Sequence, residues 1–468
     1  MTALPSGFIS RVAGITGDPF VLQDASSRET YGTDGTRQGA PADLVVLPGS
    51  TQEIARLASL CNDTRVPMVV RGAGTGYTGG AVPIHGGLLI SLERMNRILE
   101  IDEVNLLARV QPNVITGDLQ DAVEHVGLFY PPDPASLRQS AIGGNVAECA
   151  GGPRALKYGT TKRYVLALEA VLPTGEIVHT GSKAVKNVVG YDLTQLLVGS
   201  EGTLAIITEI TLRLIPRPAA QATLLAEFES IDGAVDAVTQ LIQRRVVPAA
   251  VELVDADSLR AIAQYAGRPM AGPDTAAVLI IEVDGAKAAV EEEMLLVEQA
   301  CRAVHAGAVR RAASDAERDE IWALRRELSP ALKKISTIKL NNDVVVPRGR
   351  VPQLFALVHA IRQEFGFPIA CFGHAGDGNI HVNIMVPDAG NDDEIVERRR
   401  RGDEAVRRLF EGVVGLEGSI SGEHGIGFTK RPYLGLELSR DEIALMRRVK
   451  AAFDPNGVLN PGKIFPDE

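Results

Sequence analysis

The stretch that decides the fold is Arg71-Gly-Ala-Gly-Thr-Gly-Tyr-Thr-Gly-Gly80, which follows an apolar, strand-like run. Gly74, Gly76 and Gly79 satisfy the G-x-G-x-x-G spacing of a dinucleotide fingerprint. A Rossmann unit needs a helix directly after this loop, and the glycines and proline between positions 79 and 87 would break one. A nicotinamide Rossmann domain is therefore excluded. Because residues without Cβ let successive backbone N–H groups turn inward around an anion, the loop predicts a pyrophosphate site of another kind.

Length and composition indicate a globular enzyme-sized protein. The chain has 468 residues, which predicts two or three domains, and 45% of them are hydrophobic. Its net charge of −11 disfavours binding to a phosphate backbone, so we expect no nucleic-acid partner. The four cysteines form no C-x-x-C pair, which argues against a disulfide framework or a thiolate zinc site.

The sequence also carries expectations about location. The first 19 residues lack the basic start and apolar core of a secretory signal, and the longest uncharged stretch, 72–92, contains seven glycines. We expect a cytoplasmic protein with no transmembrane segment, and peripheral contact with a membrane stays open.

Apolar periodicity predicts an α+β architecture with an internal boundary at Pro216-Arg-Pro218. Before it, a helix is expected over 51–62, behind a Ser50/Thr51 cap. After it, strands at Thr223–Phe228 and Ala276–Val283 alternate with helices at Ile231–Arg245 and up to Ala306. This order predicts an antiparallel sheet with helices on one face.

Further glycine clusters lie at 141–145, 150–154 and 198–203. Together with the stretches Pro131–Ser136 and Lys186–Leu193, they resemble the FAD-binding domain of the vanillyl-alcohol oxidase and p-cresol methylhydroxylase flavoproteins. The resemblance implies that a set of residues contacts FAD. For the pyrophosphate these are Gly72, Gly74, Thr75, Gly76 and Thr78; for the flavin, Pro131, Ser140, Gly143, Gly144, Gly151 and Tyr158; and for the adenosine side, Glu201, Gly202 and Ile207. Because the first loop has no histidine, non-covalent FAD is expected.

Three of the eight histidines fall in two glycine-framed motifs, Gly373-His-Ala-Gly-Asp-Gly-Asn-Ile-His381 and Ser421-Gly-Glu-His-Gly425. His374 and His381 flank a Gly-Asp-Gly turn, so the strand that begins at the second can face the first. With Glu423 they would make a three-ligand metal site that leaves positions open for substrate. His424 is then left as a pocket base, because imidazole is a common proton acceptor in enzymes.

The second half resembles the C-terminal domain of FAD-linked 2-hydroxyacid dehydrogenases, a family that includes glycolate oxidase flavin subunits and D-lactate dehydrogenases. The histidine motifs, Ile321–Arg326 and Phe453–Lys463 carry this resemblance. It implies that His374, His381 and Glu423 bind zinc or manganese, His424 is the base, Asn383 contacts substrate, Arg325 binds the α-carboxylate and Asn460 returns the C-terminus to the flavin. The expected domains are a two-part FAD-binding domain at 1–218, a substrate domain at 219–430 and a returning C-terminal segment at 431–468.

These residues suit oxidation of a 2-hydroxyacid. A metal that binds the hydroxyl oxygen acidifies it, His424 takes the proton, and the hydride passes from Cα to flavin N5. We expect glycolate or D-lactate over D-2-hydroxyglutarate, because a second carboxylate would need a second buried cation. The resemblance implies that relatives which oxidise dicarboxylates carry a Lys two residues before the Asp of a D-x-x-x-P stretch, whereas here Asn341 stands two residues before Asp343. Lys333, Lys334 and Lys339 stay open as alternative cations.

Two other function classes remain at this stage. Two histidines and a carboxylate also serve a metal-dependent hydrolase, which would be colourless. A non-catalytic subunit would be expected to have lost these motifs, which are intact here. For the oxidase, the electron acceptor could be a subunit with iron–sulfur clusters or a second flavin, an electron-transfer flavoprotein or a quinone.

Overall fold

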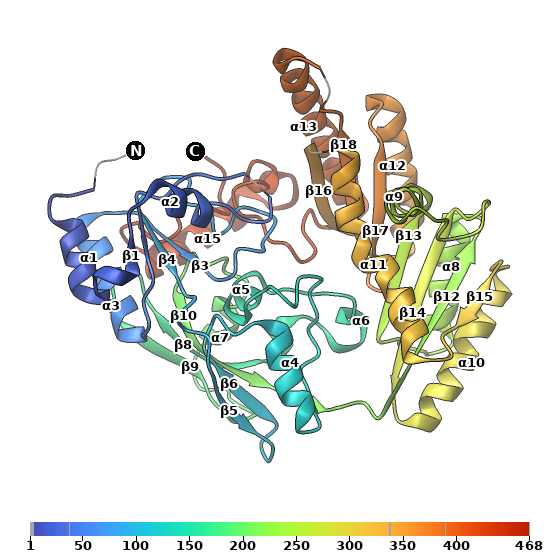
Figure 1. Ribbon diagram of the computed structural model, residues 1–468, viewed down its shortest axis with the longest axis horizontal. Coiled ribbons are helices and arrows are strands. Elements are labelled where there is room, and N and C mark those ends of the chain that lie inside the picture. The colour runs from blue at the N-terminus through green and yellow to red at the C-terminus, as the bar shows by residue number, and fades with distance from the viewer. Residues whose placement is uncertain (1–3, 37, 337, 389, 468) are drawn as a thin grey trace. The chain divides into compact units, whose positions relative to one another are not determined.

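The computed structural model describes residues 4–36, 38–336, 338–388 and 390–467, and its elements are labelled in Figure 1. They form two compact units. The first contains residues up to Gly151, then Thr160–Arg217 and the chain from Glu423 onward; the second contains Gly152–Gly159 and Pro218–Gly422. The chain enters the second unit at Gly152–Gly159, leaves the first unit again after Arg217 and returns to it at Glu423.

The first unit has two main sheets. A four-stranded sheet has the order β1-β2-β4-β3, in which β2, β4 and β3 are parallel. A five-stranded antiparallel sheet has the order β5-β6-β10-β8-β9. The strands of both are β1 (Val21–Leu22), β2 (Leu44–Val46), β3 (Met68–Arg71), β4 (Leu88–Ser91), β5 (Ile98–Asp102), β6 (Leu107–Val110), β8 (Val165–Val171), β9 (Ile177–Gly181) and β10 (Ile206–Arg213). The short strands β7 (Leu128–Phe129) and β11 (Ile215–Pro216) pair with each other.

Helices cover these sheets. They are α1 (Phe8–Thr16), α2 (Ala25–Tyr31), α3 (Thr51–Thr64), α4 (Thr116–His125), α5 (Ile142–Glu148), α7 (Leu193–Leu197), α14 (Leu434–Glu437) and α15 (Arg440–Phe453). The helix expected at 51–62 is α3. Ser50 caps it by accepting a hydrogen bond from Glu53 N, and Ile54 and Leu57 bury its apolar face. This core fixes the ends of β3 and β4, and the first glycine loop connects these two strands.

The second unit is built on a seven-stranded antiparallel sheet with the order β15-β12-β14-β13-β17-β18-β16. Its strands are β12 (Ala220–Phe228), β13 (Ala250–Asp255), β14 (Ala277–Gly285), β15 (Val309–Arg311), β16 (Ile338–Val345), β17 (Ile369–His374) and β18 (Asn379–Val386). Its helices are α6 (Ala155–Tyr158), α8 (Ile231–Gln243), α9 (Ala256–Ala266), α10 (Lys287–Ala303), α11 (Asp315–Ile335), α12 (Val351–Phe365) and α13 (Asp392–Gly415).

Helices cover both faces of this sheet, which corrects the expectation of helices on one face (Figure 1). Leu279 and Ile281 of β14 pack in a core with α8 and α10, whereas Val278 and Ile280 pack in a second core with α9 and α11. The reason is visible in the strand itself, since residues 277–281 are all apolar and such a run is typical of a strand buried on both faces.

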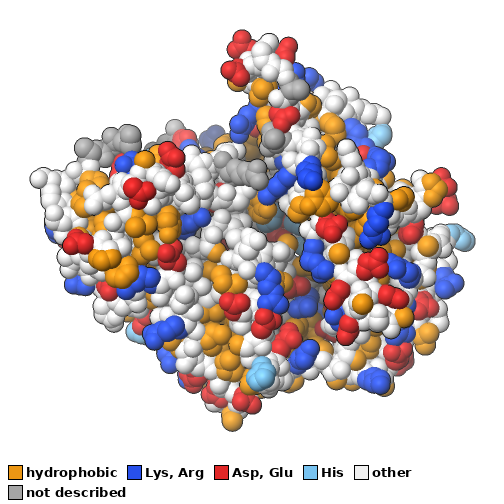
Figure 2. Space-filling view, in the orientation of Figure 1, with side chains coloured by type: hydrophobic (Ala, Val, Ile, Leu, Met, Phe, Trp, Pro, Cys, Tyr) orange, Lys and Arg blue, Asp and Glu red, His pale blue; other side chains and the backbone are white. Residues whose placement is uncertain are grey.

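Acidic and basic side chains are interspersed on the surface seen in Figure 2. Among the described residues, no helix combines the length and apolar character needed to cross a bilayer.

Candidate active site

The two histidines of the first motif lie together on one face of the second unit's sheet. His374 ends β17 and His381 lies on β18, where it is the cross-strand partner of Phe372. Their ring centroids are 5.3 Å apart in an edge-to-face arrangement, and both residues are buried. The turn between them requires Gly378, which has a φ of +84° and where a Cβ would lie 2.1 Å from Val346 O. The facing of these two imidazoles follows the sequence argument.

A buried carboxylate faces the Nδ1 atom of each histidine. Glu252 on β13 is the cross-strand partner of His374 and contacts its Nδ1 through Oε1. Asp343 on β16 is the partner of His381, with 3.6 Å between Asp343 Oδ1 and His381 Nδ1. The contact with Glu252 holds the ring of His374 and directs its Nε2 away from the carboxylate, as is usual for histidines that bind metals, whereas Asp343 and His381 lie at the distance of an ion pair.

Sequence reasoning gave neither carboxylate a site role. Glu252 had a usable signal, because it is a charged residue within the otherwise apolar run Ala249–Val254, and such a residue is rarely buried without a partner. The pairing of Asp343 depends on strand register between segments about 40 residues apart, which the sequence does not display.

Arg325 on α11 is buried, and its Nε donates to Oε2 of Glu252. Its guanidinium also lies 4.6 Å from the ring centroid of Phe372. Although desolvation opposes ionisation, His374 and Arg325 lower the pKa of Glu252 to about 2. Glu252 therefore links the predicted carboxylate-binding arginine to a predicted metal ligand.

Asn383, predicted to contact substrate, is fully buried on β18. Its Nδ2 donates to Ala370 O and His381 O, while its Oδ1 has no hydrogen-bond partner among the described residues. An unmatched acceptor in a buried site costs free energy unless a ligand or water pairs with it. Contact between Asn383 and substrate stays a prediction, and Oδ1 is the atom that would make it.

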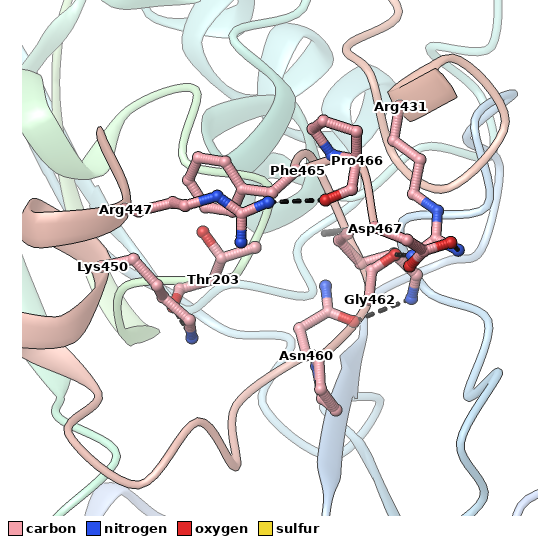
Figure 3. A pocket seen from close by; sticks show the side chains of 11 residues that line it. Thr203, Arg431, Arg447, Lys450, Asn460, Gly462, Phe465, Pro466 and Asp467 are labelled. Carbon is pink, nitrogen blue, oxygen red and sulfur yellow. Dashed lines mark hydrogen bonds and ion pairs between the residues drawn. The ribbon is translucent and has the colours of Figure 1, made fainter. Parts of the chain in front are cut away.

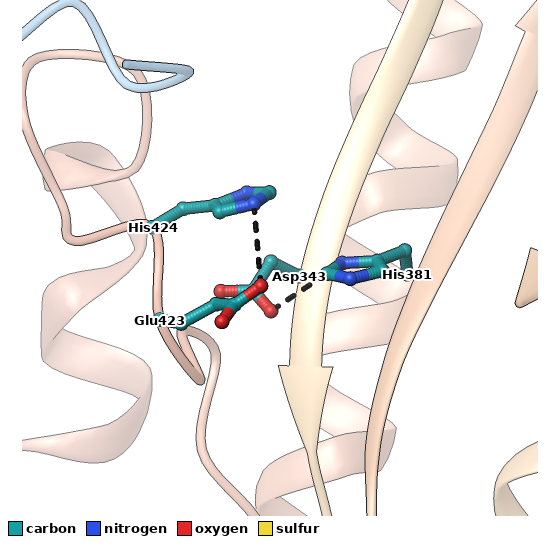
Figure 4. Close-up of side chains that lie close together, drawn as sticks. All are labelled: Asp343, His381, Glu423 and His424. Atoms are coloured by element: carbon teal, nitrogen blue, oxygen red, sulfur yellow. Dashed lines mark ion pairs between the residues drawn. The ribbon is translucent and has the colours of Figure 1, made fainter. Parts of the chain in front are cut away.

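The second motif lies at the start of the chain's return to the first unit. Glu423 Oε1 lies 4.0 Å from His424 Nε2. Figure 4 draws this pair and the pair formed by Asp343 and His381. Gly151 makes room for this carboxylate, since a Cβ there would lie 2.5 Å from Glu423 Oε2. The preceding residue, Gly422, donates its N–H to Asp343 Oδ2 at 3.0 Å within the second unit.

The predicted pyrophosphate loop and one of the predicted flavin segments lie side by side in the first unit. Gly72 opens the loop, and a Cβ there would meet Ala141 Cβ at 3.5 Å and Gly144 N at 3.8 Å. At Gly76 and Gly144, a Cβ would meet no atom within 4 Å. The backbone there borders open space that a ligand can enter.

The other predicted FAD residues occupy several elements. Ser140, Gly143 and Gly144 lie at the start of α5; Glu201 and Gly202 form the turn before β10, which carries Ile207; Pro131 follows β7; and Gly74, Thr75 and Thr78 lie in the first loop. Tyr158 belongs to the second unit, where its hydroxyl donates to Asp284 Oδ2 at 2.8 Å. Its contact with the flavin stays a prediction, as do those of the others.

Asn460 joins three parts of the first unit. Its Nδ2 donates to Gly80 O and Glu201 O, both at 2.9 Å, and its Oδ1 accepts from Lys463. The carboxylate of Glu201 is also buried. Desolvation raises the pKa of Glu201, although hydrogen bonds from Ile426 N and Gly427 N oppose the rise. Sequence reasoning placed Glu201 beside adenosine and did not foresee that its side chain holds the turn after His424.

A pocket of about 280 Å³ in the first unit carries four cations, Arg431, Arg447, Lys450 and Lys463 (Figure 3). Lys450 already donates to Thr203 O, Leu459 O and Asp454 Oδ2, and Lys463 to Val82 O, Gly80 O and Asn460 Oδ1. Since an ammonium group has three N–H donors, both are fully used by the chain. These lysines fasten the C-terminal segment.

Two family models match the chain. Residues 42–181 match a family model described as FAD binding domain, and residues 217–464 match one described as FAD linked oxidases, C-terminal domain. The chain is 44% identical to glycolate oxidase subunit GlcD of Bacillus subtilis, covering 94% of this chain and 93% of that protein. It is 38% identical to D-lactate dehydrogenase of Anaerostipes hadrus, covering 91% and 90%.

Two further comparisons bear on substrate and fold. D-2-hydroxyglutarate dehydrogenase of Stutzerimonas stutzeri is 36% identical, covering 95% of this chain and 96% of that protein. Among solved structures, p-cresol methylhydroxylase with substrate bound has a TM-score of 0.82 at 18% identity, covering 99% of this chain and 98% of that one. This structural likeness confirms the predicted fold class.

Proposed function

Because the chain belongs to the family of FAD-linked oxidases, we propose that it oxidises a small D-2-hydroxyacid, glycolate or D-lactate, to the 2-oxoacid. It is an FAD-linked oxidoreductase. The family match therefore favours oxidation over the alternative of a metal-dependent hydrolase. The observation that carries the proposal is the pair of buried histidines, each backed by a carboxylate, beside a buried arginine. Such a site suits a substrate with a hydroxyl next to a carboxylate.

The first unit fits FAD. Open space over Gly76 and Gly144 borders two backbone segments that lie side by side, as a pyrophosphate cradle requires. Gly72, Gly74, Thr75, Gly76 and Thr78 would hold the pyrophosphate without a covalent link. When bound, FAD supplies the acceptor for the hydride that leaves Cα of the substrate.

The donor set also fits a divalent ion. His374, His381 and Glu423 would hold zinc or manganese, since imidazole and carboxylate are ligands that both ions accept. When bound, the ion supplies Lewis acidity toward the substrate hydroxyl.

The protein's own groups supply binding and proton transfer. His424 accepts the hydroxyl proton as the general base. Since Nε of Arg325 is used by Glu252, the substrate carboxylate would bind through the two Nη groups, which form a planar fork. Asn383 would contact the substrate through its orphaned Oδ1, which can only accept a hydrogen bond.

Substrate size depends on whether a second cation lies near the site. Asn341, two residues before Asp343, cannot neutralise a second carboxylate. Lys339, two residues earlier still on β16, points to the same sheet face by strand alternation. Lys339 is therefore the residue through which D-2-hydroxyglutarate, the second candidate, would be accommodated, and the relative of that name supports keeping it.

Loss of flavin absorbance under anaerobic conditions tests the proposal. We expect a higher kcat/KM for D-lactate or glycolate than for D-2-hydroxyglutarate, with L-lactate as the control for handedness. A higher value for the dicarboxylate, lost in Lys339→Met, would overturn the substrate choice. Absence of bleaching by every hydroxyacid would overturn the function.

We also propose that electrons leave through a separate acceptor. The Bacillus subtilis relative is named as a subunit of glycolate oxidase, which supports a partner chain with iron–sulfur clusters or a second flavin. An electron-transfer flavoprotein or a quinone is the alternative acceptor. Reoxidation of the reduced enzyme by each of these, measured separately, distinguishes them.

A further inference from the structure

We propose that Tyr77, in the glycine loop between β3 and β4, is a positioning residue for the imidazole of His424. This inference rests on the proposed function, because the orientation of His424 matters only if it acts as a base. Both residues belong to the first unit. Tyr77 is not among the residues that the sequence predicts to contact FAD or metal.

The contact itself is a ring stack. The centroids of the Tyr77 and His424 rings lie 5.4 Å apart with 27° between their planes. The His424 side chain is only 18% exposed. A stacked neighbour restricts rotation about χ2 of the histidine, which fixes the plane in which both ring nitrogens lie.

The backbone of His424 is held by the same loop. Thr78 Oγ1 donates to His424 O at 3.2 Å, and Thr78 O accepts from Phe428 N at 3.0 Å. The approach is close enough to require Gly427, where a Cβ would lie 2.0 Å from Thr78 O. The glycine loop and the segment from His424 to Phe428, almost 350 residues apart in sequence, are therefore held together at both ends of that segment.

Glu201 holds this turn from another direction. Its carboxylate accepts from Ile426 N at 2.8 Å and Gly427 N at 2.6 Å. Thr78 and Glu201 thus fix the backbone of His424, and Glu423 Oε1 lies 4.0 Å from its Nε2. Tyr77 adds a contact with the face of the ring.

The consequence is a link between the cofactor and the base. Tyr77 stands between Gly76 and Thr78, both of which are predicted to contact the pyrophosphate. The segment that binds the cofactor thus also orients the base. From the usual strength of aromatic pairs, loss of the ring should slow flavin reduction about 2- to 10-fold.

The test compares Tyr77→Leu with Tyr77→Phe, which keeps the ring and removes only the hydroxyl. Both are prepared with FAD bound, and two quantities are measured. One is the limiting rate of flavin reduction by D-lactate in anaerobic single turnover. The other is the rate at which diethyl pyrocarbonate modifies His424, followed by mass spectrometry, with the 73% exposed His179 as internal reference.

We expect Tyr77→Leu to speed modification of His424 and to slow reduction about 2- to 10-fold, with Tyr77→Phe recovering most of both. Wild-type values for Tyr77→Leu in both measurements would overturn the inference. So would a loss of FAD with unchanged modification of His424, since Tyr77 would then serve the cofactor alone. If no hydroxyacid reduces the wild-type flavin, the proposed function fails, and the modification rates still decide whether Tyr77 positions the ring.

Discussion

Replacing Glu252 by glutamine tests the charge network behind the candidate site. Glu252 is fully buried and is contacted by His374 and Arg325. Its pKa is lowered from an ordinary value of 4.5 to about 2, which corresponds to roughly 3 kcal/mol of stabilisation at neutral pH. Removing one partner of a buried ion pair lowers the free energy of unfolding by about 3–5 kcal/mol, because the charge that remains, here on Arg325, loses its partner. We therefore expect Glu252→Gln to lower the free energy of unfolding by about 3 kcal/mol.

The assay uses the only tryptophan of the chain. Trp322 lies on α11, and its Nε1 donates to Glu282 Oε2 at 2.8 Å within the second unit. Its fluorescence during urea unfolding therefore reports on this unit. Glu397→Gln is the matched control, since Glu397 pairs with Arg400 on an exposed helix surface, where such pairs contribute about 0–1 kcal/mol.

The effect should also depend on pH with a definite sign. Because the folded-state pKa of Glu252 is depressed, its stabilisation is fully present above pH 4.5 and is lost as the pH falls through about 2. The difference between wild type and Glu252→Gln should shrink over that interval. A destabilisation no larger than that of Glu397→Gln, or one independent of pH, would refute the reasoning.

Three further predictions concern the cofactor, metal and base. Gly76→Val should fold but lack flavin colour, because its side chain enters open space beside the loop. The control is Gly14→Val, which should keep its FAD, and full FAD content in Gly76→Val would contradict the prediction. Chelation or His381→Ala should abolish turnover and spare the flavin, and elemental analysis that finds no metal in active enzyme would rule out the site. His424→Ala should keep FAD and metal but reduce the flavin about 10²–10⁴-fold more slowly. His179→Ala is the control, and an equal rate in the two variants would show that His424 is not the base.

The sequence predicted those features that depend on neighbours along the chain. The capped helix α3, the strand and helix order of the second unit and the facing of His374 and His381 across a glycine turn are all of this kind. Each follows from a cap, a periodicity or a short turn.

Features that depend on strand register were not accessible in the same way. The pairing of Asp343 with His381 joins distant segments, and the contact between Arg325 and Glu252 joins a helix to a strand 73 positions away. The second covered face of the sheet was missed although the apolar run in β14 indicated it. Glu201 was assigned from a motif, whereas its side chain function depends on the return of the C-terminal segment.

The most direct test of the central claim is the stoichiometry of one anaerobic turnover. Enzyme with bound FAD is mixed with excess D-lactate or glycolate, and both flavin absorbance and the 2-oxoacid formed are measured. Two-electron oxidation at Cα predicts one 2-oxoacid for each flavin bleached. Loss of substrate without bleaching, or bleaching without a 2-oxoacid, would contradict it.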